Sequence, residues 1–346
     1  MNIVLITGGP SAEREVSISS SKSILKALRN AGHNVKVVDP VNGSENISEE
    51  EILSETLSRD SPSLRKLEEI HRSSGKNILK CINSEIFDNV DIAFLGVHGK
   101  FGEDGKLQSL LEFRQVKYTG SGVLASVLAM DKDISKIILS SAGIKTPDWF
   151  ALNKSDFTDY EKIKLKISRS SGFPLVVKPN DEGSTVGLSI VQPDAEDIHL
   201  KNSVELAFKY SDKILIEKYI KGRELTVPVI GNEAFPVIEI KPKDGFYDYE
   251  HKYTKGMTEY YCPADIPESI KIRAAEDALK AHKTLGCAVY SRVDFILDEN
   301  DNLYCLEVNT LPGMTDTSLV PKSAKANGMS FDDLIGKLIE LSLQKN

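Results

Sequence analysis

The segment from residue 292 to residue 319 constrains the fold of this chain more than any other stretch. Two apolar runs in it flank the polar sequence at 298–302, a pattern that predicts a β-hairpin with a solvated turn. Side chains alternate between the two faces of a strand, so folding the hairpin about this turn places Asp294 roughly opposite Glu307. Two carboxylates at that spacing repel each other unless a cation lies between them.

The polar face of this hairpin has two interpretations. Arg292 lies on the same face as Asp294, and Asn309 on the same face as Glu307. Two carboxylates and an amide oxygen suit Mg²⁺, which proteins usually hold with one or two carboxylates together with substrate phosphates. Solvated sheet faces are also common, so the same side chains could simply contact water. The hairpin alone leaves both interpretations open.

Length and composition narrow the class of protein. A chain of 346 residues is too long for one compact core and predicts two or three domains. The net charge of −8 argues against a nucleic-acid partner, and four cysteines without CxxC spacing predict reduced thiols. The chain starts in an apolar strand without a basic leader, and no apolar run could span a bilayer. We therefore expect a soluble, cytoplasmic protein without a membrane partner.

Strands and helices alternate in the first third of the chain. Apolar runs at 3–6, 35–38 and 92–97 predict buried strands, and the periodicity of residues 16–31 predicts a helix between the first two. This order predicts a parallel sheet covered by helices. Residues 42–89 are polar, and the sequence assigns them no role.

A second unit is expected to begin near residue 121. Residues 173–178 and 188–191 are apolar runs joined by a polar loop, which predicts an antiparallel pair of strands. A further strand at 214–220 is expected to open a third unit, which includes the hairpin. The predicted fold is thus a mixed α/β fold with three domains, at residues 1–120, 121–213 and 214–346.

The loop at 178–187 has a composition suited to phosphate. Its lysine supplies charge, and its glycine, serine and threonine residues allow close approach of the backbone. The loop does not have the Walker A sequence and joins two strands instead of opening a helix. An ordinary hairpin loop is therefore the alternative.

Glu13 and His98 follow strands of the predicted parallel sheet, at the edge where ligands bind in such folds. Glu13 could pair with an ammonium group, or it could stabilise the start of a helix. His98 could be either a binding residue or a structural one. Further along, residues 216–220 have the pattern of a nucleotide-base contact, and Glu224 could hold a ribose hydroxyl.

Six sequence blocks occur in a characteristic order. They are Gly-Gly-Pro-Ser-Ala-Glu-Arg-Glu-Val-Ser at 8–17, His-Gly-Lys-Phe-Gly-Glu-Asp-Gly at 98–105, Met-Asp-Lys at 130–132, Lys-Pro-Asn-Asp-Glu-Gly-Ser-Thr-Val-Gly at 178–187, Tyr-Asp-Tyr-Glu-His-Lys-Tyr at 247–253 and Glu-Val-Asn-Thr-Leu-Pro-Gly-Met-Thr at 307–315. Together they resemble the D-alanine–D-alanine ligases of the ATP-grasp superfamily. The resemblance implies an ATP-grasp fold with an N-terminal Rossmann-like α/β domain, a small central lid domain and a C-terminal mixed-sheet domain.

The resemblance also implies a reaction. The γ-phosphoryl group of ATP would pass to the carboxylate of one D-alanine, and the amine of a second D-alanine would attack the resulting D-alanyl phosphate. ADP and phosphate would be released, and the D-alanyl-D-alanine would serve peptidoglycan precursor synthesis. Such a transfer needs charge neutralisation and alignment more than covalent help from the protein. Two Mg²⁺ ions, or Mn²⁺ in their place, and a homodimer are further implications.

The resemblance assigns most site residues to the nucleotide and its metal ions. Residues that would bind ATP are Lys132, Lys178, Gly183, Thr185, Glu217, Lys218, Ile220, Glu224 and Lys252. The residues that would hold the metal ions are Asp294, Glu307 and Asn309.

The remaining site residues are assigned to the two D-alanine molecules and the reacting centre. Glu13 would hold the first ammonium group; His98, Ser318 and Leu319 would complete the substrate pockets. Arg292 and the backbone N–H of Gly313 would stabilise the oxyanion. Tyr253 would hydrogen-bond toward Ser184 and Glu13.

Tyr253 bears on the choice of acceptor. Relatives that make the D-alanyl-D-lactate ester carry Phe at this position, so Tyr253 favours the dipeptide and leaves a D-serine acceptor open. Two other hypotheses are an ATP-grasp ligase with a different acceptor amine and a ligand-binding protein without turnover. The second is disfavoured, because the metal ligands and both phosphate-binding lysines are present.

Overall fold

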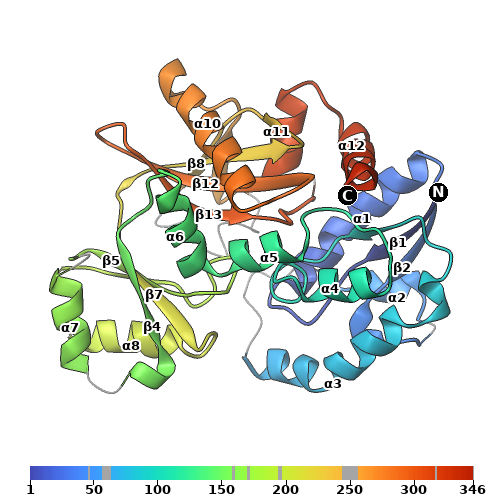
Figure 1. Ribbon diagram of the computed structural model, residues 1–346, viewed down its shortest axis with the longest axis horizontal. Helices are drawn as coiled ribbons and strands as arrows, with labels where there is room; N and C mark the ends of the chain where they lie inside the picture. The colour runs from blue at the N-terminus through green and yellow to red at the C-terminus, as the bar shows by residue number, and fades with distance from the viewer. Residues whose placement is uncertain are drawn as a thin grey trace.

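The computed structural model describes residues 1–45, 47–56, 64–157, 160–169, 172–193, 197–243, 256–315 and 318–345. Its strands form three sheets (Figure 1), one parallel and two antiparallel, which confirms the predicted mixed α/β fold. None of the helices in these ranges is long and apolar enough to cross a membrane.

The N-terminal sheet is parallel, as the alternation of strands and helices predicts. Its strands β1 (Asn2–Ile6), β2 (Asn34–Val38) and β3 (Ile92–Leu95) pair in the order β2-β1-β3. Helix α1 (Arg14–Asn30) buries Ile18, Ile24 and Leu28 and packs against α12 (Phe331–Gln344) near the C-terminus (Figure 1). The loops after β1 and β3 therefore lie at the same edge of the sheet.

Residues 42–89 belong to the N-terminal unit. They form α2 (Glu49–Ile52), α3 (Leu64–Ile82) and the short helix η2 (Glu85–Phe87), and the preceding helix η1 spans Pro40–Asn42. Their buried apolar side chains are part of the N-terminal core; they include Ile52, Ile78, Cys81, Ile82 and Phe87.

Ion pairs join this segment to the start of α1. The Arg14 guanidinium lies 2.5 Å from the fully buried carboxylate of Asp39 and 2.8 Å from Glu55. Lys66 on α3 lies 3.1 Å from Glu15. Residues 42–89 therefore contact the first turn of α1, next to Glu13.

The central sheet is antiparallel and has the order β4-β7-β5-β6. The predicted pairing of residues 173–178 with 188–191 is confirmed by the ladder between β5 and β6. The predicted strand at 214–220 pairs with β4 and β5, so it lies in this sheet, although we expected it to open the third unit. The domain limits themselves stay a prediction. The strands are β4 (Trp149–Asn153), β5 (Leu175–Pro179), β6 (Ser189–Val191) and β7 (Lys213–Lys218).

Helices cover the central sheet and connect it to the rest of the chain. The helix α7 (Tyr160–Arg169) and the helix α8 (Asp197–Ala207) supply apolar side chains to its core. Three helices precede the sheet in the chain: α4 (Lys106–Phe113), α5 (Val123–Met130) and α6 (Lys132–Ser141). The short helix η3 spans Lys154–Asp156.

The C-terminal sheet has the order β11-β10-β8-β12-β13, and β9 pairs with β8. Helix α10 (Glu268–Thr284) packs against β8 and β12, and α11 (Leu319–Ala326) follows the hairpin. The strands are β8 (Gly222–Ile230), β9 (Glu233–Ala234), β10 (Ile238–Pro242), β11 (Thr258–Tyr261), β12 (Tyr290–Asp298) and β13 (Leu303–Asn309).

The predicted hairpin is confirmed by the pairing of β12 with β13. Asp294 is the register partner of Glu307, and Arg292 is the partner of Asn309. The register shifts between Asp294 and Phe295, as in a β-bulge, which bends a strand and re-aims its side chains. The carboxylate of Asp298 closes the turn by accepting hydrogen bonds from the backbone of residues 300 and 302.

Candidate active site

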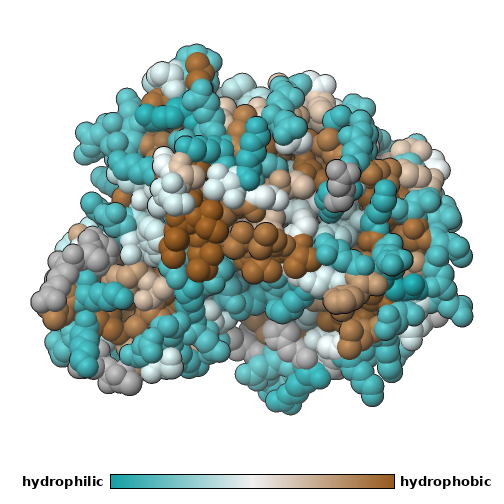
Figure 2. Space-filling model, in the orientation of Figure 1, coloured by the Kyte–Doolittle hydropathy of each residue, from teal (hydrophilic) through white to brown (hydrophobic). Residues whose placement is uncertain are grey.

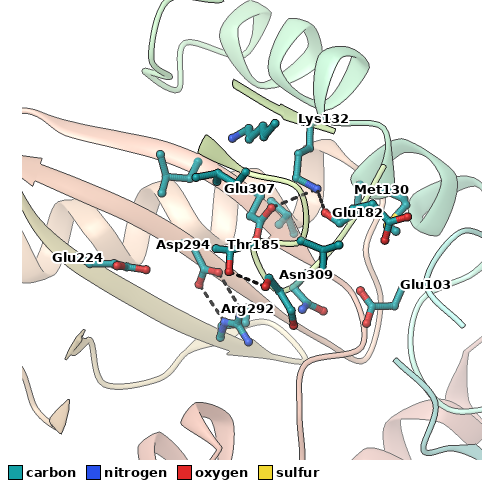
Figure 3. A pocket seen from close by; sticks show the side chains of 18 of the residues that line it. Glu103, Met130, Lys132, Glu182, Thr185, Glu224, Arg292, Asp294, Glu307 and Asn309 are labelled. Carbon is teal, nitrogen blue, oxygen red and sulfur yellow. Dashed lines mark hydrogen bonds and ion pairs between the residues drawn. The ribbon is translucent and has the colours of Figure 1, made fainter. Parts of the chain in front are cut away.

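One pocket is lined by residues of the central and C-terminal sheets and of the loops after β1 and β3 (Figure 3). Lys252 and Tyr253 lie outside the described residues. Every other site residue predicted from the sequence lines this pocket: Glu13, His98, Lys132, Lys178, Gly183, Ser184, Thr185, Glu217, Lys218, Ile220, Glu224, Arg292, Asp294, Glu307, Asn309, Gly313, Ser318 and Leu319.

Glu217 on β7 is a buried carboxylate held between two lysines. The Lys178 ammonium on β5 lies 2.7 Å from Glu217 Oε1, and the Lys136 ammonium on α6 lies 3.1 Å from Oε2. Burial raises the pKa of Glu217, but the two positive charges outweigh this effect and hold the pKa below its usual range. Glu217 is therefore ionised at neutral pH.

Sequence reasoning missed Lys136. It lies four residues after Lys132, so the two lysines share one face of α6, and this face is buried. The opposite face carries Ile134 and Ile137, which are exposed. A pair of lysines at helical spacing, opposite two isoleucines, is the signal that could have identified Lys136.

Lys132 connects the loop after β5 to the hairpin. Its ammonium group donates a hydrogen bond to the carbonyl oxygen of Glu182 at 2.7 Å and lies 3.4 Å from Glu307 Oε2 (Figure 3). Lys132 starts α6, and Asp131 caps this helix by accepting from the backbone N–H of Ile134. The helix start thus fixes a lysine beside a carboxylate of the hairpin.

Asp294 is held by an arginine on its own strand. The Arg292 guanidinium donates to both carboxylate oxygens, at 2.9 and 2.7 Å (Figure 3). Thr226 on the neighbouring strand β8 donates its hydroxyl to Asp294 Oδ1 at 2.5 Å. Thr226 is a second residue that sequence reasoning missed, because its contact depends on the pairing of β8 with β12.

The hairpin offers oxygen ligands that suit Mg²⁺. Asp294 and Glu307 are register partners, and Asn309 lies at the end of β13. Among the described residues, no group of three or more His, Cys, Asp or Glu side chains could hold a metal ion. A cation here would therefore take two carboxylates and an amide oxygen from the protein and its other ligands from substrate or water.

Glu13 points into the pocket instead of capping α1. It occupies the N-cap position of this helix, but its side chain makes no capping hydrogen bond. The Ser184 hydroxyl donates to Glu13 Oε1 instead. A Cβ atom at Gly183 would lie 2.5 Å from Glu13 Oε2, so this approach requires a glycine. Glu13 thus lies both at the start of α1, where the helix dipole favours a carboxylate, and in the pocket wall, so these contacts do not decide between its two interpretations.

His98 has protein partners on both ring nitrogens. Its Nδ1 lies 2.8 Å from the carbonyl oxygen of Leu311, and because a carbonyl only accepts, Nδ1 carries the proton. Its Nε2 lies 3.0 Å from the Ser20 hydroxyl. Burial lowers the pKa of His98, so the ring is neutral and holds the loop after β13 in place.

Glu103 is a buried carboxyl group next to His98. It accepts a hydrogen bond from the backbone N–H of Gly99 at 2.9 Å and lies 3.8 Å from the His98 ring. Burial and the neighbouring charge of Glu13 raise its pKa to about 8. Glu103 is a further pocket residue that the sequence analysis did not single out, although it lies in the block at 98–105.

The loop between β13 and α11 closes the pocket beside Glu13. Ser318 precedes α11 and accepts a hydrogen bond from the backbone N–H of Thr315 at 2.9 Å. A Cβ atom at Gly313 would lie 2.9 Å from the Ser318 hydroxyl, so a larger residue would displace it. This packing leaves the backbone of Gly313 as part of the pocket wall.

Comparisons with known proteins agree with the sequence blocks. Residues 2–121 match the family model "D-ala D-ala ligase N-terminus", and residues 138–340 match "D-ala D-ala ligase C-terminus". Together the two matches cover most of the chain.

Full-length relatives and solved structures are also similar. The D-alanine–D-alanine ligase of Halalkalibacterium halodurans is 40% identical over 350 residues, which covers 100% of both proteins. A crystal structure of D-alanine–D-alanine ligase from Bacillus anthracis, complexed with ATP, is 33% identical with a TM-score of 0.74, and covers 99% of this chain and 98% of that one. The VanG D-Ala:D-Ser ligase of Enterococcus faecalis is 30% identical with a TM-score of 0.79, and covers 99% of each chain. The chain therefore belongs to the D-alanine–D-alanine ligase family of the ATP-grasp superfamily.

Proposed function

We propose that this chain joins two molecules of D-alanine to form D-alanyl-D-alanine for peptidoglycan precursor synthesis, converting ATP to ADP and phosphate through a D-alanyl phosphate intermediate. The observation that carries this proposal is the convergence in one pocket of three kinds of group. They are the buried lysines Lys132 and Lys178, the hairpin carboxylates Asp294 and Glu307, and the Glu13–Ser184 pair.

The buried lysines of the pocket suit the nucleotide. Lys132 and Lys178 would bind the phosphates of ATP, and the loop with Gly183 and Thr185 would cover them. The adenosine would lie against the residues after β7 and the start of β8, which are Glu217, Lys218, Ile220 and Glu224. We also assign Lys252 to this group, by its place in the sequence block at 247–253.

The hairpin suits the metal ions that accompany ATP. Asp294, Glu307 and Asn309 would hold Mg²⁺, or Mn²⁺, with two ions expected. When bound, such ions would neutralise the charge of the phosphate oxygens and align them for transfer. Arg292 is paired with Asp294 and Lys132 with Glu307, so each of these carboxylates has a cationic side chain as a neighbour.

A second group of pocket residues suits the amino acids. Glu13 would hold the ammonium group of the first D-alanine, with His98 behind it, and Ser318 with Leu319 would bind the carboxylate of the second. Arg292 and the backbone N–H of Gly313 would stabilise the oxyanion that forms when the second amine attacks. Ser184, which contacts Glu13, would complete the closed site together with Tyr253.

Phosphate release from ATP tests this proposal. We expect release that depends on D-alanine, with far less for L-alanine and for D-lactate, and a product with the mass of the dipeptide. Release without any dependence on D-alanine would overturn the assignment. No release with any amino acid, together with tight binding of ATP, would favour a ligand-binding protein without turnover.

A D-serine acceptor is a second candidate, and the fold similarity to the VanG D-Ala:D-Ser ligase favours testing it. In a mixture of equal D-alanine and D-serine, we expect the dipeptide of two D-alanines to predominate, because Tyr253 and most of the similar relatives favour it. A predominance of D-alanyl-D-serine would reverse this choice of acceptor.

We also propose that the enzyme is a cytoplasmic homodimer. Figure 2 shows a hydrophobic patch over α5 and α6, where Leu124, Val127 and Ile137 are exposed. Exposed apolar patches of this kind often mark protein interfaces. Sedimentation velocity should give a dimer for the parent chain and a monomer for Leu124→Glu. A monomeric parent chain would exclude the dimer.

A further inference from the structure

Lys136 and Lys178 share one carboxylate, but a ligand can reach only one of the two lysines. Lys178 lines the pocket together with Glu217. Lys136 is 1% exposed and lies behind Glu217, outside the pocket wall. The two ion pairs thus run from opposite sides to the two oxygens of Glu217.

Lys136 is fixed where it lies. Its ammonium group donates to the carbonyl oxygen of Pro147 at 3.4 Å and lies 5.2 Å from the centre of the Trp149 ring. The Trp149 indole N–H in turn donates to Asp133 at 2.9 Å, which holds the ring in place. A carbonyl, a carboxylate and an aromatic face together satisfy a buried ammonium group.

Lys178 is held by far fewer contacts. Within the described ranges, Glu217 is the only hydrogen-bond or ion-pair partner of its ammonium group. Under the proposed function, Lys178 must bind the phosphates of ATP, so it must loosen this pair when ATP enters. Glu217 is 3% exposed and would then remain in the wall as a buried charge.

A buried charge that loses its partner is strongly destabilising. We propose that Lys136 is a positioning residue that serves as the resident counter-ion of Glu217, so that Lys178 can exchange Glu217 for the phosphates of ATP. Lys136 acts through Glu217 and touches no substrate. The inference rests on the proposed function, because it takes the nucleotide as the ligand of Lys178.

This role distinguishes ATP from adenosine. Adenosine has no phosphates, so it can bind while Lys178 stays on Glu217. ATP requires the exchange, and without Lys136 that exchange would leave Glu217 unpaired or force it to take up a proton. Removing Lys136 should therefore weaken the binding of ATP much more than the binding of adenosine.

Calorimetric titration of the full chain with ATP and with adenosine, in the presence of Mg²⁺ and without D-alanine, tests this inference. We expect Lys136→Met to raise the Kd for ATP at least tenfold and the Kd for adenosine less than twofold. Lys136→Arg keeps the charge and should preserve the ratio of the two affinities. Lys145→Met is a matched control, since the Lys145 ammonium also lies over an aromatic ring, 4.4 Å from the centre of Tyr304, but Lys145 is exposed and does not line the pocket.

Two further variants keep the test decisive if Lys136→Met does not fold. The double variant Lys136→Met/Glu217→Gln has no buried carboxylate, so its preference for ATP over adenosine should return to at least the level of the parent chain. Glu217→Gln alone should increase that preference, because Lys178 no longer has to leave a carboxylate. Equal weakening of ATP and adenosine in Lys136→Met, or a reduced preference for ATP in Glu217→Gln, would overturn the inference.

Failure of this inference differs from failure of the proposed function. If the parent chain shows D-alanine-dependent phosphate release and the affinity ratios do not change among the variants, only the role of Lys136 is wrong. If the parent chain shows no such release, the function itself is wrong, whatever the ratios are.

Discussion

Glu217 and Glu103 are two buried glutamates in the same pocket, and their charge states differ. Glu217 contacts two lysines, and its pKa lies below the usual range. Glu103 contacts a backbone N–H and a histidine; in the part of the chain that the structure describes, no lysine or arginine forms an ion pair with it, and its pKa rises to about 8. Burial is common to both, so the neighbouring charges decide which of them is ionised.

The different charge states of Glu217 and Glu103 give their surroundings in the pocket different roles. Under the proposed function, the lysines beside Glu217 can exchange this carboxylate for phosphates, whereas the raised pKa of Glu103 limits negative charge near Glu13. Glu13 is the carboxylate proposed to bind an ammonium group. A second ionised carboxylate next to it would repel the carboxylate of Glu13. Asp294, a third buried carboxylate of the pocket, has one arginine and one threonine as partners.

The largest effect is expected from Asp294→Asn, which replaces the carboxylate on β12 by a neutral amide. We expect kcat to fall by about a thousandfold or more, in the range seen when a group that stabilises transition-state charge is removed, while the thermal unfolding midpoint changes little. Steady-state phosphate release and a melting curve measure the two quantities. Asp301→Asn is the control, because it makes the same chemical change at an exposed position outside the pocket. Full activity of Asp294→Asn would remove Asp294 from the site.

A smaller effect is expected from Gly183→Ala, which disturbs the end of the pocket near Glu103. The new Cβ atom would lie 2.5 Å from Glu13 Oε2 and must displace this carboxylate. We expect the KM for D-alanine to rise by about tenfold, which corresponds to about 1.4 kcal/mol, with a smaller change in the KM for ATP. Initial rates at varied substrate concentrations give both constants. Gly75→Ala, where a Cβ atom meets nothing within 4 Å, should leave both unchanged; an equal rise in both KM values would contradict the expected selectivity.

The last effect concerns stability alone: Glu103→Gln should change how the free energy of unfolding depends on pH. The folded-state pKa of Glu103, about 8, lies above its ordinary value of 4.5, so the folded state binds its proton more tightly than the unfolded chain does. This contribution to stability is complete below pH 4.5 and is lost as the pH rises to 8. The parent chain should therefore lose stability relative to Glu103→Gln across this window, by up to about 1.4 kcal/mol per pH unit. Urea unfolding of both chains at pH 5.5 and 8.5 measures the difference, and a constant difference would contradict the raised pKa.

The sequence predicted those parts of the fold and site that depend on local pattern. The hairpin of β12 and β13 follows from two apolar runs around a polar turn, and its register places Asp294 opposite Glu307 as expected. The pairing of β5 with β6 follows from the same kind of pattern. The parallel N-terminal sheet follows from the alternation of strands and helices.

Contacts between distant segments were not predictable in this way. Thr226 reaches Asp294 only because β8 pairs with β12, and Lys136 reaches Glu217 only because α6 lies beside the central sheet. The strand β7 lies in the central sheet because it pairs with β4, an earlier and distant segment of the chain, and no local pattern indicates this pairing. Helix α6 also reverses the usual rule, since its lysines are buried while two isoleucines are exposed.

The ion pairs between residues 42–89 and the start of α1 have a consequence for how this enzyme tolerates substitution. Arg14 follows Glu13 directly and forms ion pairs with Glu55 of this segment and with Asp39, which precedes the segment. A change at Glu55 would therefore alter the position of Glu13, the carboxylate proposed to bind an ammonium group, although Glu55 does not line the pocket. In a saturation mutagenesis screen for growth without external D-alanyl-D-alanine, we expect Glu55 and Arg14 to share one pattern of sensitivity. Residues outside the pocket, such as Glu55, would thus restrict which substitutions the active site tolerates.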